Sequence, residues 1–420
     1  MRVSPLKKEL RYYDVHPVVV RAGSRAEVVV RPLFEHVRFA PGQPVNVKLR
    51  PAEGVAGQTG WGEEPALAVM PGDDGALRIP CAFEREQEYI LLVERPELPP
   101  LNFRLYALED DLFCRRPYRG DLHMHSARSD GKEAPAYVAA SCRKIGLDFM
   151  ALTDHRQYAP SLEAMRAFEG VNTDLRIFPG EEIHPPDNRV HMVNFGGNFS
   201  INALFESQAY RDEVQAIATG LTGLPDGMDP YPYASCVWCF EQIRRGGGLG
   251  IFCHPYWFAR NKYDSPRDLI DLIYERQPYD ALELLGGYHP HEEESNNLQV
   301  MRYTEERAKG KRIPVVGVSD AHGCETGELF GWFWTLVLAP SCDLPDLVSS
   351  IKDLYSVAVS SLPGQTQRAF GPFRLVRYAQ FLLREVLPLH DELCLEEGRL
   401  MLAHAAGDGE AAGALAGLKG

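Results

Sequence analysis

The sequence predicts an α/β protein in which a parallel α/β barrel or sheet follows a small antiparallel β-sandwich. The first observation is the length, since 420 residues and 47.0 kDa correspond to two or three domains of about 150 residues each. The second is a change of pattern at Tyr118, where short β-rich runs give way to strands that alternate with helices. The third is a series of histidines and carboxylates at predicted strand ends, where α/β barrels build their sites.

The first domain, residues 1–117, is predicted to be the sandwich. Its strands are rich in β-branched and aromatic residues, and Pro/Gly turns separate them. They are AEVVVRPL, PVNVKLRP, GALRIPCAF, EYILLVERP and LNFRLYAL, with turns at PGQP, PGDDG and PELPP. Runs of this length with turns between them favour antiparallel pairing.

The second domain, residues 118–345, is predicted to hold the alternating strands and helices. The helix in GKEAPAYVAASCRKIG has Pro135 near its start and Gly146 after its end, and the strand LDFMALTDH follows. Ser265, Pro266 and Asp268 resemble a capping box before RDLIDLIYERQ, which precedes the strand DALELLGG. A later helix leads into IPVVGVSDAH. This repetition favours a parallel sheet or barrel.

Three further segments complete the expected organisation. The alternation lapses at 198–234, where we expect an insertion that acts as a lid over the site. Residues 346–402 are expected to be helices that complete the barrel. The Ala/Gly-rich tail, 403–420, has no aromatic residue and is expected to be frayed.

Charge and composition exclude several classes of protein. Hydrophobic residues make up 45% and charged residues 24%, which is ordinary for a globular chain. The 44 basic and 58 acidic residues give a net charge of −14, which argues against a nucleic-acid polymer as partner. No apolar run is long enough for a signal peptide or a membrane span, so we expect a cytoplasmic protein without membrane contact. Cys236 and Cys239 in CVWC lie in a predicted helix and are expected to pack in the core.

The histidines are the main indication of function. Nine of the thirteen lie between His123 and His322, most of them where a predicted strand ends. GDLHMHSARSDG places His123 and His125 on one side of an extended chain, and VVGVSDAH repeats this spacing with an aspartate and a histidine. The candidates are His123, His125, Asp130, Asp154, His155, Glu181, Glu182, His191, His254, Asp320 and His322.

Imidazole nitrogens and carboxylate oxygens without thiolate suit Zn²⁺, Mn²⁺ or Fe²⁺, and a cluster of this size can hold two or three ions. The sequence has no GxSxG elbow, which disfavours a serine triad. It also has no GxxxxGK[ST] or GxGxxG phosphate loop. A site for divalent metal ions is therefore the favoured interpretation of the cluster.

On these motifs the chain resembles the PHP (polymerase and histidinol phosphatase) family of metallohydrolases. DLHxHSxxSDG, LTDH, GxEI, H, HP and SDAH occur in family order over residues 118–345. The resemblance implies a distorted (β/α)₇ TIM-like barrel with up to three metal ions at the strand carboxyl ends. Its implied ligands are His123, His125, Glu182 and Asp320 for the first ion, Asp130, His155 and His322 for the second, and Glu182, His191 and His254 for the third.

The acidic residues in the motifs are assigned different roles. Glu182 is preferred to Glu181 because GEEI matches GxEI, and only one of two neighbours on a strand faces the site. Asp121 and Asp154 match motif positions that are not ligands, and we expect them to orient histidines. His184, beside two prolines, is expected to be structural.

The leading hypothesis is a phosphoesterase that uses a metal-bridging hydroxide to cleave a small phosphorylated metabolite or nucleotide. Asp320 and His322 would act in catalysis through the metals, and Arg156 would clamp the phosphate. Tyr256, His289 and His291 are further candidates for substrate binding.

Other functions remain open. The β domain before GDLHMHSARSDG also resembles the branch that includes carbaryl-type hydrolases, which keeps a carbamate, amide or ester substrate open as an alternative. A metal-stabilised binding module is a further alternative, and a proofreading nuclease is disfavoured by the charge. No motif indicates an oligomeric state.

Overall fold

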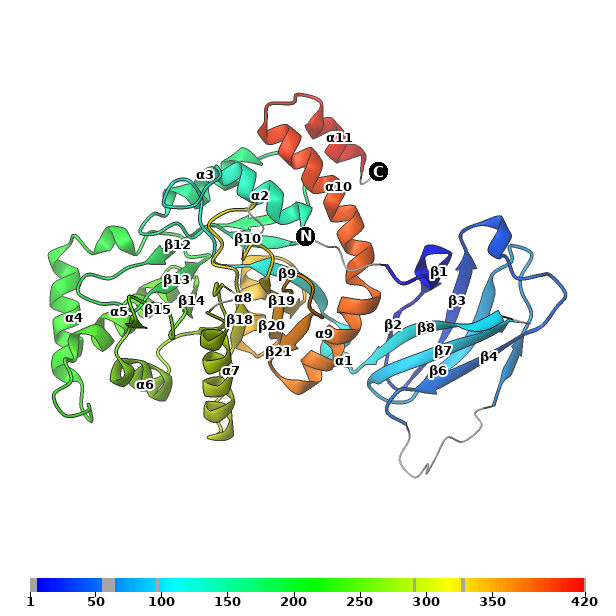
Figure 1. The fold of residues 1–420 in the computed structure, drawn as a ribbon, viewed down its shortest axis with the longest axis horizontal. Coiled ribbons are helices and arrows are strands. Elements are labelled where there is room, and N and C mark those ends of the chain that lie inside the picture. Colours follow the sequence, from blue (N-terminus) through cyan, green and yellow to red (C-terminus); the bar gives the residue numbers. More distant parts are fainter. Residues whose placement is uncertain (1–5, 55–64, 96–97, 290–291, 326–328, 419–420) are drawn as a thin grey trace. The chain divides into compact units, whose positions relative to one another are not determined.

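The computed structural model describes residues 6–54, 65–95, 98–289, 292–325 and 329–418, and it divides into two compact units (Figure 1). The N-terminal unit combines the chain up to Arg116 with Arg377–Leu389. The larger unit combines Pro117–Val376 with the chain from His390 onward. Each unit is described separately below.

The N-terminal unit is built from two β-sheets. A three-stranded antiparallel sheet has the order β1-β3-β6, and a five-stranded sheet has the order β2-β8-β7-β4-β5. The strands are β1 (Tyr13–His16), β2 (Val19–Arg21), β3 (Ser24–Pro32), β4 (Val45–Pro51), β5 (Leu67–Val69), β6 (Leu77–Phe83), β7 (Gln87–Arg95) and β8 (Leu98–Leu108).

One apolar core joins these two sheets. Along β6, buried and exposed residues alternate strictly, which is the pattern of a strand with one face in a core. Phe83 from the first sheet and Leu91 and Phe103 from the second belong to the same buried cluster. The prediction of an N-terminal β-rich region is confirmed. Part of α9 (Phe373–Glu385) also belongs to this unit, where Tyr378 and Phe381 contact Tyr106 at ring distances of 5.0 and 5.3 Å.

The larger unit contains a two-stranded hairpin, β15 (Phe258–Ala259) with β16 (Lys262–Tyr263), and two large sheets that share a second core. One has six strands in the order β11-β10-β9-β19-β20-β21, and the other has five in the order β12-β13-β14-β17-β18. The strands are β9 (Arg116–Asp121), β10 (Phe149–Ala151), β11 (Arg176–Phe178), β12 (Gly180–Ile183), β13 (Met192–Phe195), β14 (Leu249–Phe252), β17 (Ala281–Leu285), β18 (Val315–Gly317), β19 (Phe333–Ala339), β20 (Ser356–Ser360) and β21 (Arg368–Phe370).

This mixed α/β architecture is confirmed, but a closed (β/α)₇ barrel is not. In the part of the chain that the structure describes, the strands of the two large sheets form separate ladders. β13 pairs antiparallel with both β12 and β14, and β20 pairs antiparallel with β19 and β21. Side chains from both sheets nevertheless fill one core, which includes Phe149, Ile251 and Val337.

Helices follow the strands of the larger unit. They are α2 (Pro135–Lys144), α3 (Ala159–Ala167), α4 (Gln208–Gly220), α5 (Tyr231–Arg245), α6 (Arg267–Arg276), α7 (Glu293–Ala308) and α8 (Leu344–Lys352), and then α10 (Leu387–Ala405) and α11 (Ala411–Gly417). α2 starts at Pro135 as predicted, and Gly146 follows its end with a positive φ of 94°. α5 buries Cys236 and Cys239, as expected for core cysteines. Among the described helices, none has the length and apolar character that crossing a bilayer requires.

Several predicted elements differ from the observed ones. The capping box at Ser265 does not form, because the N-cap of α6 is Pro266, and the Ser265 hydroxyl instead donates to the carbonyl of Arg189 at 3.4 Å. The segment 346–402 contains strands β20 and β21 as well as helices: the buried strand β20 pairs with β19, and β21 pairs with β20. The segment 198–234 holds a 3₁₀ turn (Asn202–Leu204), α4 and the start of α5.

The C-terminal tail is also more ordered than expected. α10 continues to Ala405, and α11 occupies Ala411–Gly417. Alanine has the highest helix propensity, and Ala411 and Leu415 of this short helix are buried. The alanines that suggested a frayed tail instead form a helix, because an apolar contact supports them.

Candidate metal centre

Backbone hydrogen bonds join the loops that follow neighbouring strands. After β9 and β18, the His125 amide donates to the Ala321 carbonyl and the Asp320 amide to the His123 carbonyl, both at 2.9 Å. After β10, the Glu182 amide donates to Thr153 at 3.1 Å. The predicted strand-end residues are therefore brought to one place by main-chain pairing.

The antiparallel strand β13 explains how His191 reaches the same place. His191 precedes β13, whereas the other histidines follow or end parallel strands. Because β13 runs antiparallel to β12 and β14, its first residues lie at the same sheet edge as the last residues of those strands. Met192, at the start of β13, pairs with Ile183 and Phe252 at the ends of its neighbours.

The carboxylate of Glu182 is the centre of the cluster. It is fully buried, and histidines from six positions surround it. Its Oε1 lies 2.9 Å from His191 Nδ1 and 3.3 Å from His254 Nε2. Its Oε2 lies 3.4 Å from His184 Nε2, 3.6 Å from His123 Nε2, 3.7 Å from His125 Nε2 and in close contact with His155 Nδ1.

Asp320 forms a second group with the first histidine pair. Its Oδ1 lies 2.9 Å from His125 Nε2 and 3.3 Å from His123 Nε2. Asp320 has a left-handed backbone with φ of 51°, a conformation that non-glycine residues adopt at an energetic cost and that is concentrated at functional sites.

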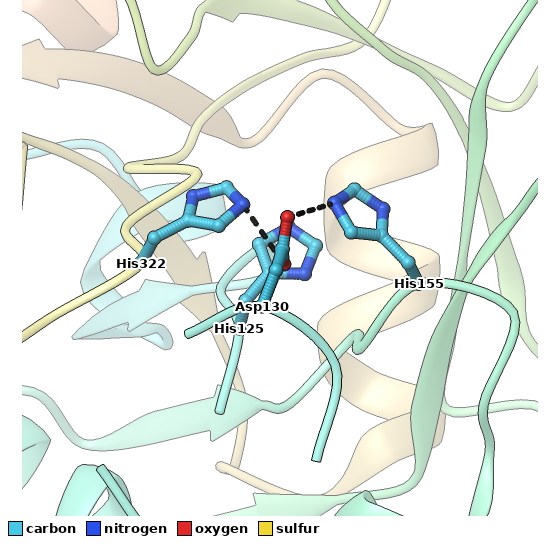
Figure 2. Close-up of side chains that lie close together, drawn as sticks. All are labelled: His125, Asp130, His155 and His322. Atoms are coloured by element: carbon cyan, nitrogen blue, oxygen red, sulfur yellow. Dashed lines mark ion pairs between the residues drawn. The ribbon is translucent and has the colours of Figure 1, made fainter. Parts of the chain in front are cut away.

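Asp130 forms a third group with two other histidines. Figure 2 shows its carboxylate between the imidazoles of His322 and His155, at 3.3 Å from Nε2 of the former and 3.4 Å from Nε2 of the latter. The His125 ring stacks on both, with centroid distances of 4.2 Å. All nine residues expected as ligands are thus brought together.

The donor atoms fit divalent cations. His123 Nε2, His125 Nδ1 and Glu182 Oε2 are buried without a hydrogen-bond partner, which is costly for polar atoms in a protein interior. The ligand atoms of each group lie within 4.8 Å of one another. Imidazole and carboxylate donors at this spacing suit Mn²⁺, Fe²⁺ or Zn²⁺. The groups include His125–Asp130–His155–His322, His123–His125–Asp320 and His123–Glu182–His254.

The surrounding imidazoles keep the central carboxylates ionised. Burial alone raises the pKa of Glu182, but the neighbouring imidazoles of His123 and His155 outweigh it and hold the pKa well below its usual range. The same balance applies to Asp320, where burial is opposed by His123 and His125 and the pKa is again lowered. Both side chains are therefore negatively charged acceptors at neutral pH.

Glu283, in the middle of β17, is a site residue that the sequence reasoning missed. Its Oε2 accepts from His123 Nδ1 at 3.0 Å, and its Oε1 accepts the His254 amide at 3.2 Å. This contact fixes the proton of His123 on Nδ1 and leaves the lone pair of Nε2 directed at the cluster. The signal was an acidic residue inside the otherwise apolar run ALELLGG.

His184 is a second missed residue, and its expected structural role is corrected. Its Nε2 lies 3.0 Å from His155 Nδ1, and its ring stacks on His191 at 3.8 Å. The sequence did contain a signal for this position. Side chains two residues apart on a strand point to the same side, and His184 follows Glu182 by two residues at the end of β12.

The acidic residues at the other motif positions hold backbone rather than histidine rings. Asp121 accepts the amides of Ser319 and His123, and burial raises its pKa to about 7. Asp154 accepts the amides of Ser126 and Ser129, each at 3.0 Å. The expected role in orienting histidines stays a prediction: Asp121 holds His123 through its backbone amide, and Asp154 holds the loop that follows His125.

Glu181 points away from the histidines. Its carboxylate accepts from Ser200 Oγ and Asn202 Nδ2, each at 2.8 Å, and from the amide of Ile201. It therefore anchors the start of the 198–234 segment next to β12.

The residues expected to bind the substrate do not belong to the histidine cluster itself. Arg156 is exposed, and its amide donates to the Glu182 carbonyl at 3.0 Å. Tyr256 is half-buried beside Tyr263. His289 lies in the wall of a separate cavity. His291 falls outside the described residues.

Comparisons with known proteins complete the description of the site. No family model matches the chain. A stretch of 82 residues, 18% of this chain, is 35% identical to DNA polymerase/3'-5' exonuclease PolX of Bacillus subtilis. The chain covers 14% of that relative's length.

Two solved structures are similar at low sequence identity. One is a two-domain protein from Bacteroides vulgatus that contains a predicted PHP-like metal-dependent phosphoesterase, at 16% identity and a TM-score of 0.41, covering 58% of this chain and 65% of that one. The other is an amidohydrolase from Chromobacterium violaceum, at 20% identity and a TM-score of 0.32, covering 49% and 87%. These similarities are partial, and the resemblance to PHP metallohydrolases rests on the sequence motifs.

Proposed function

We propose that this chain is a metal-dependent phosphoesterase that hydrolyses a phosphoester of a small metabolite or a nucleotide. The observation that carries the proposal is the buried, ionised Glu182 carboxylate inside a ring of histidines, where buried ligand atoms of His123 and His125 make no hydrogen bond. The proposed ligands are His123, His125, Asp130, His155, Glu182, His191, His254, Asp320 and His322. The two sheets that share one core would form the distorted barrel around them.

Two or three divalent ions, when bound, supply an activated water at neutral pH and neutralise phosphoryl oxygens. The protein residues provide the rest. Glu182 and Asp320 contribute the negative charge that holds the ions. Glu283 keeps the proton of His123 on Nδ1, on the side away from the cluster.

Arg156 is the proposed contact to the phosphoryl group. It follows His155, its backbone is hydrogen-bonded to Glu182, and its side chain is exposed at the edge of the cluster. A guanidinium binds two oxygens of a phosphate in parallel, which favours this role. Its replacement would raise the KM for a phosphoester more than it lowers the metal content.

The test is a panel of three substrates given to Mn²⁺-loaded protein: a phosphomonoester, a phosphodiester and an aryl carbamate. Asp320→Asn is the inactive variant, and the exposed Asp353→Asn is its matched control. We expect phosphoester turnover that is lost in Asp320→Asn and retained in the control. Carbamate turnover alone would place the chain among carbamate hydrolases and would overturn the proposal.

A further inference from the structure

A cavity of about 120 Å³ lies in the larger unit, between α7 and the β20–β21 hairpin. Half of the residues that line it are polar or charged, namely His289, Glu293, Asn296, Asn297, Ser360 and Arg368, and the other half are apolar or aromatic. The apolar or aromatic residues are Leu285, Tyr288, Val300, Phe333, Leu362 and Phe370.

The cavity begins on the loop that contacts the metal cluster. Leu285 ends β17 and accepts the amide of Val318, two residues before Asp320. Gly287 then lies so close to Asp320 that a Cβ added there would be 2.3 Å from the Asp320 Cβ. Tyr288 and His289, which follow directly, line the cavity. The loop therefore contacts the cluster through Gly287 and the cavity through its next two residues.

The size of the cavity limits what it can hold. An engineered apolar cavity of about 150 Å³ binds benzene. At about 120 Å³, this cavity has room for roughly one six-membered ring.

The charged groups at the rim are already paired. Arg368 Nη2 lies 3.8 Å from Glu293 Oε1, and the Arg368 guanidinium lies 6.0 Å from the centroid of the Phe370 ring. A charged occupant would compete with this pair, whereas a neutral ring would leave it intact. The rim therefore favours an uncharged group.

We propose that this cavity binds a single, uncharged ring of the substrate, joined to the phosphoryl group that the metal cluster holds. This inference rests on the proposed function and narrows it to phosphoesters whose alcohol carries one six-membered ring. A substrate with a small aliphatic alcohol would gain nothing from the cavity, because the apolar walls would have no partner.

The experiment compares two ligands, benzylphosphonate and methylphosphonate. Neither contains a phosphoester bond, so the enzyme cannot hydrolyse them. They differ only by the phenyl ring. Calorimetric titration of each into the Mn²⁺-loaded full-length protein gives two dissociation constants. We expect benzylphosphonate to bind at least tenfold more tightly.

Leu362→Trp fills the cavity, and Leu393→Trp places the same side chain on an exposed part of α10 as a control. Leu362→Trp should bind both ligands equally, and its dissociation constant for methylphosphonate should equal that of the wild type. Leu393→Trp should keep the wild-type preference for benzylphosphonate. Val300→Trp, from the opposite wall, is the second variant if Leu362→Trp does not fold.

Equal affinities in the wild type, or a preference that survives in the filled variant, would overturn the cavity assignment. Metal-dependent binding of methylphosphonate would then still support the proposed function. If neither ligand binds to metal-loaded wild-type protein, the proposed function fails, and the assignment of the cavity fails with it.

Discussion

Glu181 and Glu182 are adjacent in sequence but differ in environment. Glu182 is surrounded by imidazoles, whereas Glu181 accepts hydrogen bonds from the chain at 200–202. The alternation of side chains along β12 causes this difference, and it is the reason that the sequence could narrow the choice to one of the two.

The first prediction separates these two carboxylates. Glu182→Gln should weaken Mn²⁺ binding by more than about 100-fold, because it removes charge from the shared central ligand, and outer-shell changes alone cost about 10–100-fold. Glu181→Gln should leave Mn²⁺ affinity nearly unchanged and lower the free energy of unfolding by about 1–3 kcal/mol. Calorimetry and urea denaturation measure the two effects. Equal loss of metal affinity in both variants would contradict the assignment.

The second prediction concerns Glu283. Glu283→Gln should weaken Mn²⁺ binding by about 10-fold, because an amide can present its NH₂ to His123 Nδ1 and favour the wrong tautomer. Glu169→Gln, on the exposed surface, is the control. A Co²⁺-substituted protein adds a spectroscopic readout, since a reoriented imidazole changes the visible absorption. Unaltered affinity and spectrum in Glu283→Gln would show that Glu283 does not orient His123.

At the scale of elements, α10 is attached to the larger unit by buried ion pairs. Arg143 on α2 contacts Glu397 at 2.6 Å and Asp148 at 2.9 Å, and His390 contacts the same Asp148 at 2.9 Å. Arg143 and Glu397 are almost fully buried. These contacts hold the C-terminal helix against the loop that leads into β10.

The third prediction is that Glu397→Ala lowers the free energy of unfolding by about 1–3 kcal/mol, because it removes the acceptor of the buried Arg143 Nε, while Asp148 still pairs with the guanidinium. Glu396→Ala, one residue earlier and exposed, should change it by less than about 0.5 kcal/mol. Urea denaturation of both variants checks this. A change below about 1 kcal/mol for Glu397→Ala would show that the pair does not secure the helix.

The fourth prediction is a pH dependence that originates at His390. Burial lowers its pKa, but the carboxylates of Asp148 and Asp391 outweigh burial and raise it to about 11. Protonated His390 therefore stabilises the folded protein. This stabilisation is fully present below about pH 6.5, the pKa of histidine in an unfolded chain, and it is lost as the pH rises toward 11.

The stability difference between wild type and His390→Gln should therefore shrink as the pH rises from about 6.5 to 10. Thermal unfolding of both proteins across this range measures the difference. Cys394 lies 3.5 Å from the imidazole, so Cys394→Ala serves as a background for the same comparison. A difference that stays constant over the range would contradict the assigned ionisation of His390.

Elements differed in how well local sequence predicted them. The start of α2 at Pro135 and the five longer strands of the N-terminal sheets, β3, β4, β6, β7 and β8, follow from local signals, whereas β1, β2 and β5 were not predicted. Ser265 did not cap α6, and α11 formed where composition suggested a frayed tail. In both cases tertiary contacts that lie outside the local window decided the outcome.

At the scale of the whole molecule, the motifs predicted which residues meet, but not how the strands around them are joined. The i, i+2 pairs and strand ends indicated a cluster, and the family resemblance singled out nine of its members as ligands. The antiparallel course of β13 and β20, and the contribution of Arg377–Leu389 to the N-terminal unit, depend on contacts between distant parts of the chain. Glu283 was missed for the same reason, since its partner His123 is 160 residues away.

The central claim is that the ring of histidines around Glu182 is a metal centre with more than one ion. The most direct measurement is X-ray diffraction from Mn²⁺-soaked crystals, with anomalous data collected on both sides of the manganese absorption edge. We predict two or three anomalous peaks, each surrounded by side chains of the nine proposed ligands, and their loss in Asp320→Asn. Well-ordered crystals without a peak in this cluster would contradict the claim.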